Sequence, residues 1–311
     1  MATKIVNEIS SVIYSLPWFV ARDEGYFTEE GLDVEFVKAR GGNPPSGSED
    51  PNTCNPILSH VPFEEGEVKV FRACEEGNIR RAYDLDKSKV EGFDVRITSL
   101  QPSRPLHALV SAPGSQYDRP AALSGKGVAV NFFAGSHFAA IRLLEGFVGK
   151  GNFKLRHFGG PGDRLAAVLR GEVESAIIME PYITLAEKLG ANILAQGHFV
   201  ATDVAREDLD PLDLLKLYRA LNKAADFLNA SPENKRKYIP LLLNDIPDDY
   251  EWGKPAVEDF HLPHLKFGHT ASYPQAEYDR SRQILEDYDL LPKGVESESI
   301  VDNRAAEAVA A

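Results

Sequence analysis

The sequence predicts an α/β protein in which strands and helices alternate along the chain. Between residues 123 and 179, buried strand candidates and helix candidates follow one another, a pattern typical of parallel sheets with helices on both faces. The N-terminal part has the same order: a strand candidate over 4–9 precedes a loop, a short helix closed by glycine, and a second strand ending at Val37. The length of 311 residues leaves room for about two domains.

A long loop and two strands follow this opening unit. Turn-forming residues dominate 41–66, which predicts a loop or an irregular insertion, and a loop of this length is often functional. Strand candidates then occupy 67–73 and 93–100, and the second of these alternates apolar and polar residues.

The chain is expected to enter a second region near residue 102. Strand candidates there cover four segments, at 106–112, 123–131, 153–158 and 173–179. Helices are expected to begin at Gly135 and at Asp163, since apolar residues recur after Gly135 at helical spacing. The part after residue 202 is expected to be mainly helical, with a helix from Pro232 to about Leu243.

The segment from Pro17 to Val37 resembles the N-terminal signature of type 2 periplasmic binding proteins. Within that group the chain is most similar to the alkanesulfonate-, taurine- and nitrate-binding proteins and the thiamin-pyrimidine synthases, and distantly similar to sulfinate desulfinase. The turn at Glu180–Pro181 and the ending at 300–302 resemble the same family. The resemblance implies a two-lobed type 2 periplasmic-binding-protein fold, with a cleft that holds a small, usually anionic, organic molecule.

This resemblance also implies how the chain divides. We expect lobe I to contain residues 1–101 and 196–311, and lobe II to contain residues 102–195 as one continuous insertion. The two chain crossings between the lobes would form the hinge.

Composition limits the partners. The net charge of −13 argues against nucleic acid and anionic membrane surfaces, so an anion needs a local basic pocket. The first ten residues carry an acid and no apolar stretch, and no apolar run approaches the roughly 20 residues of a membrane helix. We therefore expect a cytoplasmic protein without membrane insertion; a removed export signal, and hence a periplasmic protein, stays the alternative.

Four segments are expected to face the cleft, and their polar and aromatic residues are the candidate ligand contacts. Aromatic residues after the first strand can stack on a ligand, arginine forks bind carboxylate or sulfonate, and helix N-termini favour anions. In desulfinase, a site arginine matches Arg80 most closely. The candidate ligand-binding residues are Tyr14, Trp18, Arg72, Glu75, Asn78, Arg80, Arg81, Asn131, Ser136 and Arg164.

Three residues are candidates for catalysis. Cys74 lies beside arginines that can lower the pKa of a thiol, although most free cysteines are small buried hydrophobic residues. His137 stands at the head of a predicted helix as a possible acid or base, and Glu180 can transfer protons or simply shape a turn. The cysteine of desulfinase lies elsewhere, so its chemistry is not expected here.

No cofactor or metal is expected. The chain lacks a phosphate-binding loop, and Cys54, His60, His261, His264 and His269 have irregular spacings that make weak metal sites. The cysteine-rich iron motif of the thiamin-pyrimidine synthases is also absent.

Two functions fit these residues. The first is a cytoplasmic lyase or hydrolase, similar to a decarboxylase or desulfinase, that acts on a small anionic organic acid, which we expect to be aromatic. The alternative is the substrate-binding protein of an ABC transporter for sulfonate, nitrate or a related anion, with a permease as its partner. The unusual segment 71–81 favours the first, and we expect the enzyme.

Overall fold

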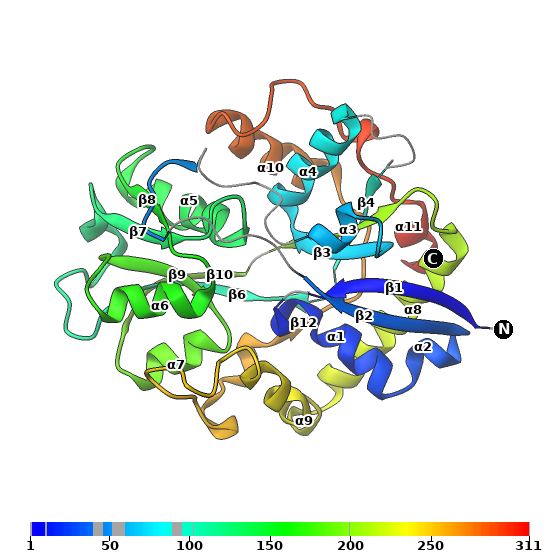
Figure 1. Cartoon of the computed structure of the whole chain (residues 1–311), viewed down its shortest axis with the longest axis horizontal. Coiled ribbons are helices and arrows are strands. Elements are labelled where there is room, and N and C mark those ends of the chain that lie inside the picture. Colours follow the sequence, from blue (N-terminus) through cyan, green and yellow to red (C-terminus); the bar gives the residue numbers. More distant parts are fainter. Residues whose placement is uncertain are drawn as a thin grey trace.

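The computed structural model describes residues 2–9, 11–39, 46–51, 60–88, 95–101, 103–198 and 200–310. It contains two five-stranded sheets, each covered by helices, which form two lobes side by side (Figure 1). The N- and C-termini both lie at the first lobe. Cys54 lies outside the described residues.

The first sheet is mixed. Its strands lie in the order β2 (Leu32–Lys38), β1 (Thr3–Ile9), β3 (Val70–Cys74), β11 (Ala201–Arg206) and β4 (Val95–Leu100). Strand β1 pairs in parallel with β2 and β3, whereas β11 is antiparallel to both β3 and β4. A strand from late in the chain therefore separates two strands from its first third.

The second sheet is built from the middle of the chain. Its order is β10 (Asn192–His198), β6 (Leu106–Ser111), β9 (Ser175–Met179), β7 (Gly127–Val130) and β8 (Lys154–His157). Strand β7 is parallel to β8 and β9, and β6 is antiparallel to its two neighbours. A small ribbon of β5 (Ser103–Arg104) and β12 (Lys266–Phe267) lies outside both sheets.

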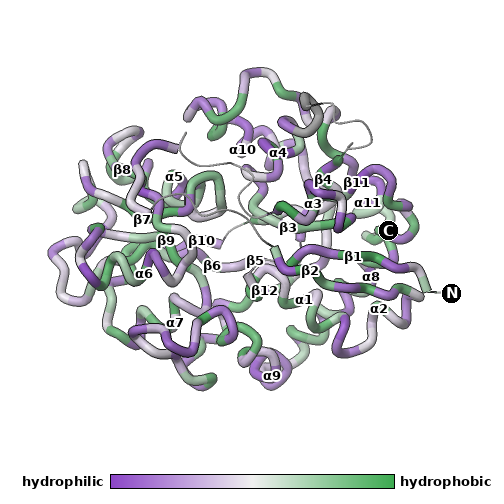
Figure 2. Tube along the Cα trace, in the orientation of Figure 1, coloured by the Kyte–Doolittle hydropathy of each residue, from purple (hydrophilic) through white to green (hydrophobic). Residues whose placement is uncertain are grey.

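Helices cover both sheets, and hydrophobic and hydrophilic stretches alternate along most of them (Figure 2). The α-helices are α1 (Val12–Asp23), α2 (Tyr26–Glu29), α3 (Val61–Glu64), α4 (Glu75–Ser88), α5 (Gly135–Val148), α6 (Pro161–Leu169), α7 (Tyr182–Lys188), α8 (Pro211–Ala230), α9 (Pro232–Leu243), α10 (Gln275–Asp287) and α11 (Arg304–Ala310). Short 3-10 helices are η2 (Pro120–Leu123), η3 (Val257–Asp259), η4 (Leu262–His264) and η5 (Ser297–Ser299). No helix among the described residues is both long and apolar enough to cross a membrane.

The chain passes between the sheets after β4 and again after β10. Two further segments reach the second lobe. Gly47 donates its N–H to the carbonyl of His157 at the end of β8, and Tyr250 donates its hydroxyl to the carbonyl of Gly162 in α6. The division into residues 102–195 and the remainder stays our proposal. In that division the segments of Gly47 and Tyr250 belong to lobe I, although both form hydrogen bonds with the second lobe.

Helix α1 begins at Val12, so the loop that we expected between the first strand and the first helix is mostly helical. In the structure Pro17 lies inside the helix, where it cannot donate to the carbonyl of Ile13. The hydroxyl of Ser103 donates to that carbonyl instead, at 2.9 Å, so the carbonyl that the proline leaves without its helical donor is still satisfied.

Candidate functional site

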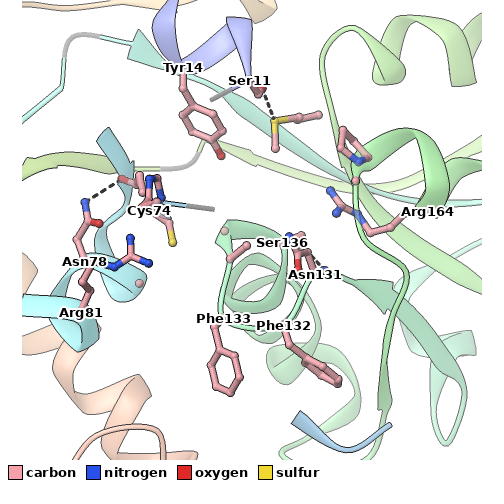
Figure 3. Close-up of a pocket in the computed structure, with 18 residues that line it drawn as sticks. Ser11, Tyr14, Cys74, Asn78, Arg81, Asn131, Phe132, Phe133, Ser136 and Arg164 are labelled. Atoms are coloured by element: carbon pink, nitrogen blue, oxygen red, sulfur yellow. Dashed lines mark hydrogen bonds between the residues drawn. The ribbon is translucent and has the colours of Figure 1, made fainter. Parts of the chain in front are cut away.

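A cavity of about 170 Å³ lies between the two lobes. Its volume is similar to the roughly 150 Å³ of a protein cavity that holds benzene, so a small organic molecule fits. Side chains from both lobes surround it (Figure 3). The lining residues are Ser11, Tyr14, His60, Ala73, Cys74, Gly77, Asn78, Arg81, Asn131, Phe132, Phe133, Ala134, Gly135, Ser136, Gly160, Pro161, Arg164 and Met179.

Four helices direct their N-termini at this cavity. Ser11 precedes α1, Cys74 precedes α4, Gly135 opens α5 and Pro161 opens α6, and all four of these residues line the cavity. The first N–H groups of a helix lack intrahelical acceptors and carry partial positive charge. The cavity therefore favours an anion even in a chain with an overall charge of −13.

Arg164 supplies a formal positive charge from the second lobe. The side chain is buried, with 2% of the residue exposed, and its guanidinium donates to the backbone carbonyls of Ile177, at 2.6 Å, and Gly159. Within the described part of the chain it forms no ion pair. The neighbouring carboxylate of Asp163 accepts the N–H of Gly160 at 3.0 Å instead. Burial lowers the pKa of Arg164 to about 10, so the group stays charged at neutral pH.

Arg81 faces the cavity from the first lobe, on the side opposite Arg164 (Figure 3). Its Nε atom lies 3.4 Å from a carboxylate oxygen of Glu64, and its guanidinium lies over the ring of Phe71. Burial lowers the pKa of Arg81, while the charges of Glu64 and Glu8 oppose that shift. Arg81 thus has a carboxylate within ion-pair distance, whereas Arg164 only feels the charge of Asp163 without pairing with it in the described part of the chain.

Tyr14 connects the lobes at the cavity wall. Its hydroxyl lies 3.1 Å from Nε2 of His107 in β6. Burial lowers the pKa of His107 to about 3, so the ring is neutral, and burial also raises the pKa of Tyr14. This pair is a neutral hydrogen bond between α1 and the second sheet.

Asn78 and Ser136 are held by local hydrogen bonds. The Nδ2 atom of Asn78 donates to the hydroxyl and the carbonyl of Thr202 at 2.8 and 3.0 Å. Ser136 lies in the first turn of α5, whose N-cap position is occupied by Ala134. The Ser136 hydroxyl accepts the backbone N–H of Asn131, at 2.8 Å, which fixes the turn between β7 and α5.

Close packing at Gly77 brings α4 against that turn. A side chain at Gly77 would place its Cβ 2.6 Å from the Cys74 sulfur and 3.2 Å from the carbonyl oxygen of Phe133. Phe133 itself has a φ of 61°, a left-handed conformation that is uncommon outside glycine. The turn that carries Asn131 and Ser136 is therefore tightly constrained beside the cavity.

Of the predicted ligand contacts, Tyr14, Asn78, Arg81, Asn131, Ser136 and Arg164 line the cavity, and the others do not. Arg72 donates two hydrogen bonds to Asp203, at 2.8 and 3.0 Å, and stacks over Trp18. Both Arg72 and Trp18 are buried in the first lobe. Their contacts give them structural roles, so we leave them out of the proposed site.

Glu75 and Arg80 are also occupied elsewhere. Glu75 and its neighbour Glu76 accept hydrogen bonds from Arg142 of α5, at 2.9 and 2.8 Å, which joins α4 to the second lobe. Arg80 pairs with Asp84 on its own helix at 3.6 Å and lies over the ring of Phe133. Neither residue lines the cavity.

The three catalytic candidates do not assemble into one active site. Cys74 lines the cavity, but burial raises the pKa of its thiol, contrary to the lowered value we considered. His137 accepts the N–H of Phe133, and burial lowers its pKa to about 3. Glu180 accepts hydrogen bonds from the backbone and hydroxyl of Thr184. Neither His137 nor Glu180 lines the cavity.

Ser11, His60, Gly160 and Met179 line the cavity without having been predicted as contacts. Ser11 donates to the sulfur of Met179 at 3.6 Å across the lobes. A signal was present for Ser11 and Gly160, since each directly precedes a helix. His60 also precedes a helix, α3, but it lies within 41–66, where the sequence predicts a loop or an irregular insertion and no helix start. In the described part of the chain no three histidine, cysteine or acidic side chains group as metal ligands.

No protein-family model matches the sequence, and no curated protein matches it. Solved structures match at low identity over almost the whole chain. The alkanesulfonate-binding protein SsuA from Xanthomonas axonopodis pv. citri, bound to MOPS, is 15% identical with a TM-score of 0.72, and the match covers 97% of this chain and 98% of that chain.

Two other structures are similar. The periplasmic nitrate-binding protein NrtA from Synechocystis PCC 6803 is 14% identical with a TM-score of 0.69, over 99% of this chain and 88% of that one. A DszB mutant in complex with biphenyl-2-sulfinic acid is 13% identical with a TM-score of 0.60, over 99% of both chains.

The chain has the periplasmic-binding-protein fold. Identities this low establish the fold alone, and they confirm the two-lobed architecture expected from the opening segment. Among the similar structures, the SsuA proteins and NrtA are sulfonate- or nitrate-binding proteins, and another is the ligand-binding component of an ABC-type import system, which overturns our prediction of a cytoplasmic lyase or hydrolase. The physical reason is that two of the three predicted catalytic residues, His137 and Glu180, do not line the cavity in which a ligand would bind.

Proposed function

We propose that this protein is the substrate-binding component of an ABC transporter, and that it binds a small organic anion in the cavity between its lobes. The ligand would be captured outside the cytoplasmic membrane and delivered to a permease. Sulfonates, nitrate and related anions are the ligand class suggested by the names of the similar proteins.

Arg164 carries this proposal. Among the described residues this buried guanidinium donates to two backbone carbonyls and forms no ion pair, so a bound anion would balance its charge, and burial of a charge without a paired partner is costly. The converging N-termini of α1, α4, α5 and α6 add partial positive charge around the same space. A carrier needs only this ground-state complementarity, and no general acid or base has to reach the ligand.

Isothermal titration calorimetry with small carboxylates, sulfonates and nitrate tests the proposal. We expect at least one organic anion to bind with a dissociation constant in about the micromolar range and to be recovered unchanged by mass spectrometry. Arg164→Gln should weaken that binding by about 2–4 kcal/mol, since the charged partner of the anion is lost.

Arg170 provides a matched control on the same helix. It ends α6 outside the cavity and pairs with Glu251 at the surface. Arg170→Gln should leave anion affinity unchanged. Equal affinities for wild type and Arg164→Gln, or chemical conversion of the bound compound, would contradict the proposed function.

A further inference from the structure

His60 forms a second polar feature of the cavity, separate from Arg164. The residue is 8% exposed, and its Nδ1 atom is hydrogen-bonded to a carboxylate oxygen of Glu8 in β1, which is 2% exposed. Its ring packs on Phe71, with 4.2 Å between the ring centroids. Both contacts fix the orientation of the imidazole at the cavity wall.

The bond to Glu8 determines which nitrogen of His60 carries the proton. With the Glu8 carboxylate as the acceptor of this bond, Nδ1 carries the proton and Nε2 keeps a free lone pair. Burial and the positive charge of Arg81 hold the pKa of His60 well below its usual range, so the ring stays neutral. Among the described residues, none forms a hydrogen bond with Nε2. A residue of the cavity wall thus offers an acceptor, beside the N–H donors of the helix N-termini.

The acceptor and the free positive charge come from different lobes. Arg164 lies on α6 of the second lobe, whereas His60 precedes α3 in the first lobe. The charge near His60 is already offset, since Arg81 interacts with Glu64 and Glu8. An acid group is therefore favoured at Arg164, and a neutral donor is favoured at His60.

We propose that the ligand carries a hydrogen-bond donor, a hydroxyl or N–H group, besides its acid group, and that this donor binds to Nε2 of His60. The proposal rests on the proposed function and narrows its ligand class to hydroxy- or amino-substituted organic acids. Nitrate and unsubstituted alkanesulfonates have no such donor and leave the acceptor unpaired, which a buried site penalises.

Two pairs of probes isolate the donor group. In each pair a methyl group replaces a hydroxyl: 2-hydroxyethanesulfonate with propane-1-sulfonate, and 3-hydroxypropanoate with butanoate. Calorimetry on the wild type should give about tenfold tighter binding for the hydroxylated member of at least one pair. Equal binding of both members in both pairs would overturn the inference.

Two variants at one position test the role of Nε2. The amide of His60→Asn can donate to Glu8 in place of Nδ1, but it has no atom at the position of Nε2. The ratio of the dissociation constants of the methyl and hydroxyl probes should then fall to about one, while affinity for the methyl probe changes less than threefold. The longer His60→Gln is the matched variant, since its oxygen reaches the Nε2 position, and it should keep part of the preference. A preference that survives in His60→Asn would refute the assignment.

A measurement on the wild type avoids any effect of these variants on folding. Nitrogen-15 NMR of the imidazole rings, with the His60 signals assigned by their loss in His60→Gln, should show Nδ1 protonated and Nε2 unprotonated. A protonated Nε2 would also refute the inference. Failure of the proposed function looks different: none of the four probes binds, or Arg164→Gln leaves both members of a pair unaffected.

Discussion

Replacing Arg72 by methionine separates a structural arginine from a ligand-binding one. Arg72 is 1% exposed and donates two hydrogen bonds to Asp203, which is fully buried. In Arg72→Met the Asp203 carboxylate keeps one side-chain donor from the described residues, the hydroxyl of Ser99 at 2.8 Å. Loss of one partner from a buried ion pair costs about 3–5 kcal/mol, so we expect the free energy of unfolding to fall by that amount.

Urea unfolding followed by tryptophan fluorescence measures this loss. The double variant Arg72→Met with Asp203→Leu removes both charges and should recover most of the stability, because an apolar pair of similar volume replaces the ion pair. Anion affinity of the folded Arg72→Met protein should match the wild type. An unchanged urea midpoint together with weakened anion binding would refute the structural role and return Arg72 to the ligand site.

Three further predictions concern single contacts. Arg142→Gln should destabilise the protein, and thermal melts should show a larger loss at pH 8 than at pH 5. Burial already raises the pKa of the two buried glutamates of α4, and loss of Arg142 raises it further, so their ionisation at pH 8 becomes more costly. A loss that does not depend on pH would contradict this. Cys74 should be alkylated by iodoacetamide at least about 100-fold more slowly than a small free thiol at pH 8, measured by peptide mass spectrometry, because burial raises its pKa; rapid labelling would show an accessible thiolate. Ser103→Ala should lower the free energy of unfolding by about 1 kcal/mol in urea titrations, because the carbonyl of Ile13 loses its donor, and an unchanged midpoint would mean that water replaces the hydroxyl.

The sequence was sufficient for the order of elements, because hydrophobic periodicity is local. The strands near residues 106–112 and 173–179, and the helix from Pro232, were found close to their observed bounds. The start of α1 was not found, since the donor that allows Pro17 inside the helix comes from Ser103, 90 residues away. A local pattern cannot contain that compensation.

The site was harder to predict for the same reason. Arg72 and Arg81 belong to one basic segment, yet only Arg81 lines the cavity. What separates them is Asp203, which is 131 residues from Arg72 and reaches it only after β3 and β11 pair. His60 was overlooked as a ligand contact because its role depends on Glu8, a partner 52 residues earlier in the chain.

The position of β11 affects the order in which the two lobes can be completed during translation. Strand β4 joins the first sheet only through β11, which follows the whole second sheet in the chain. When residue 198 has been synthesised, all strands of the second sheet exist, while the first sheet still lacks the strand that holds β3 and β4 together. The lobe that begins first can therefore be completed only after the other lobe has been translated. Until then the guanidinium of Arg72 has not yet met the carboxylate of Asp203.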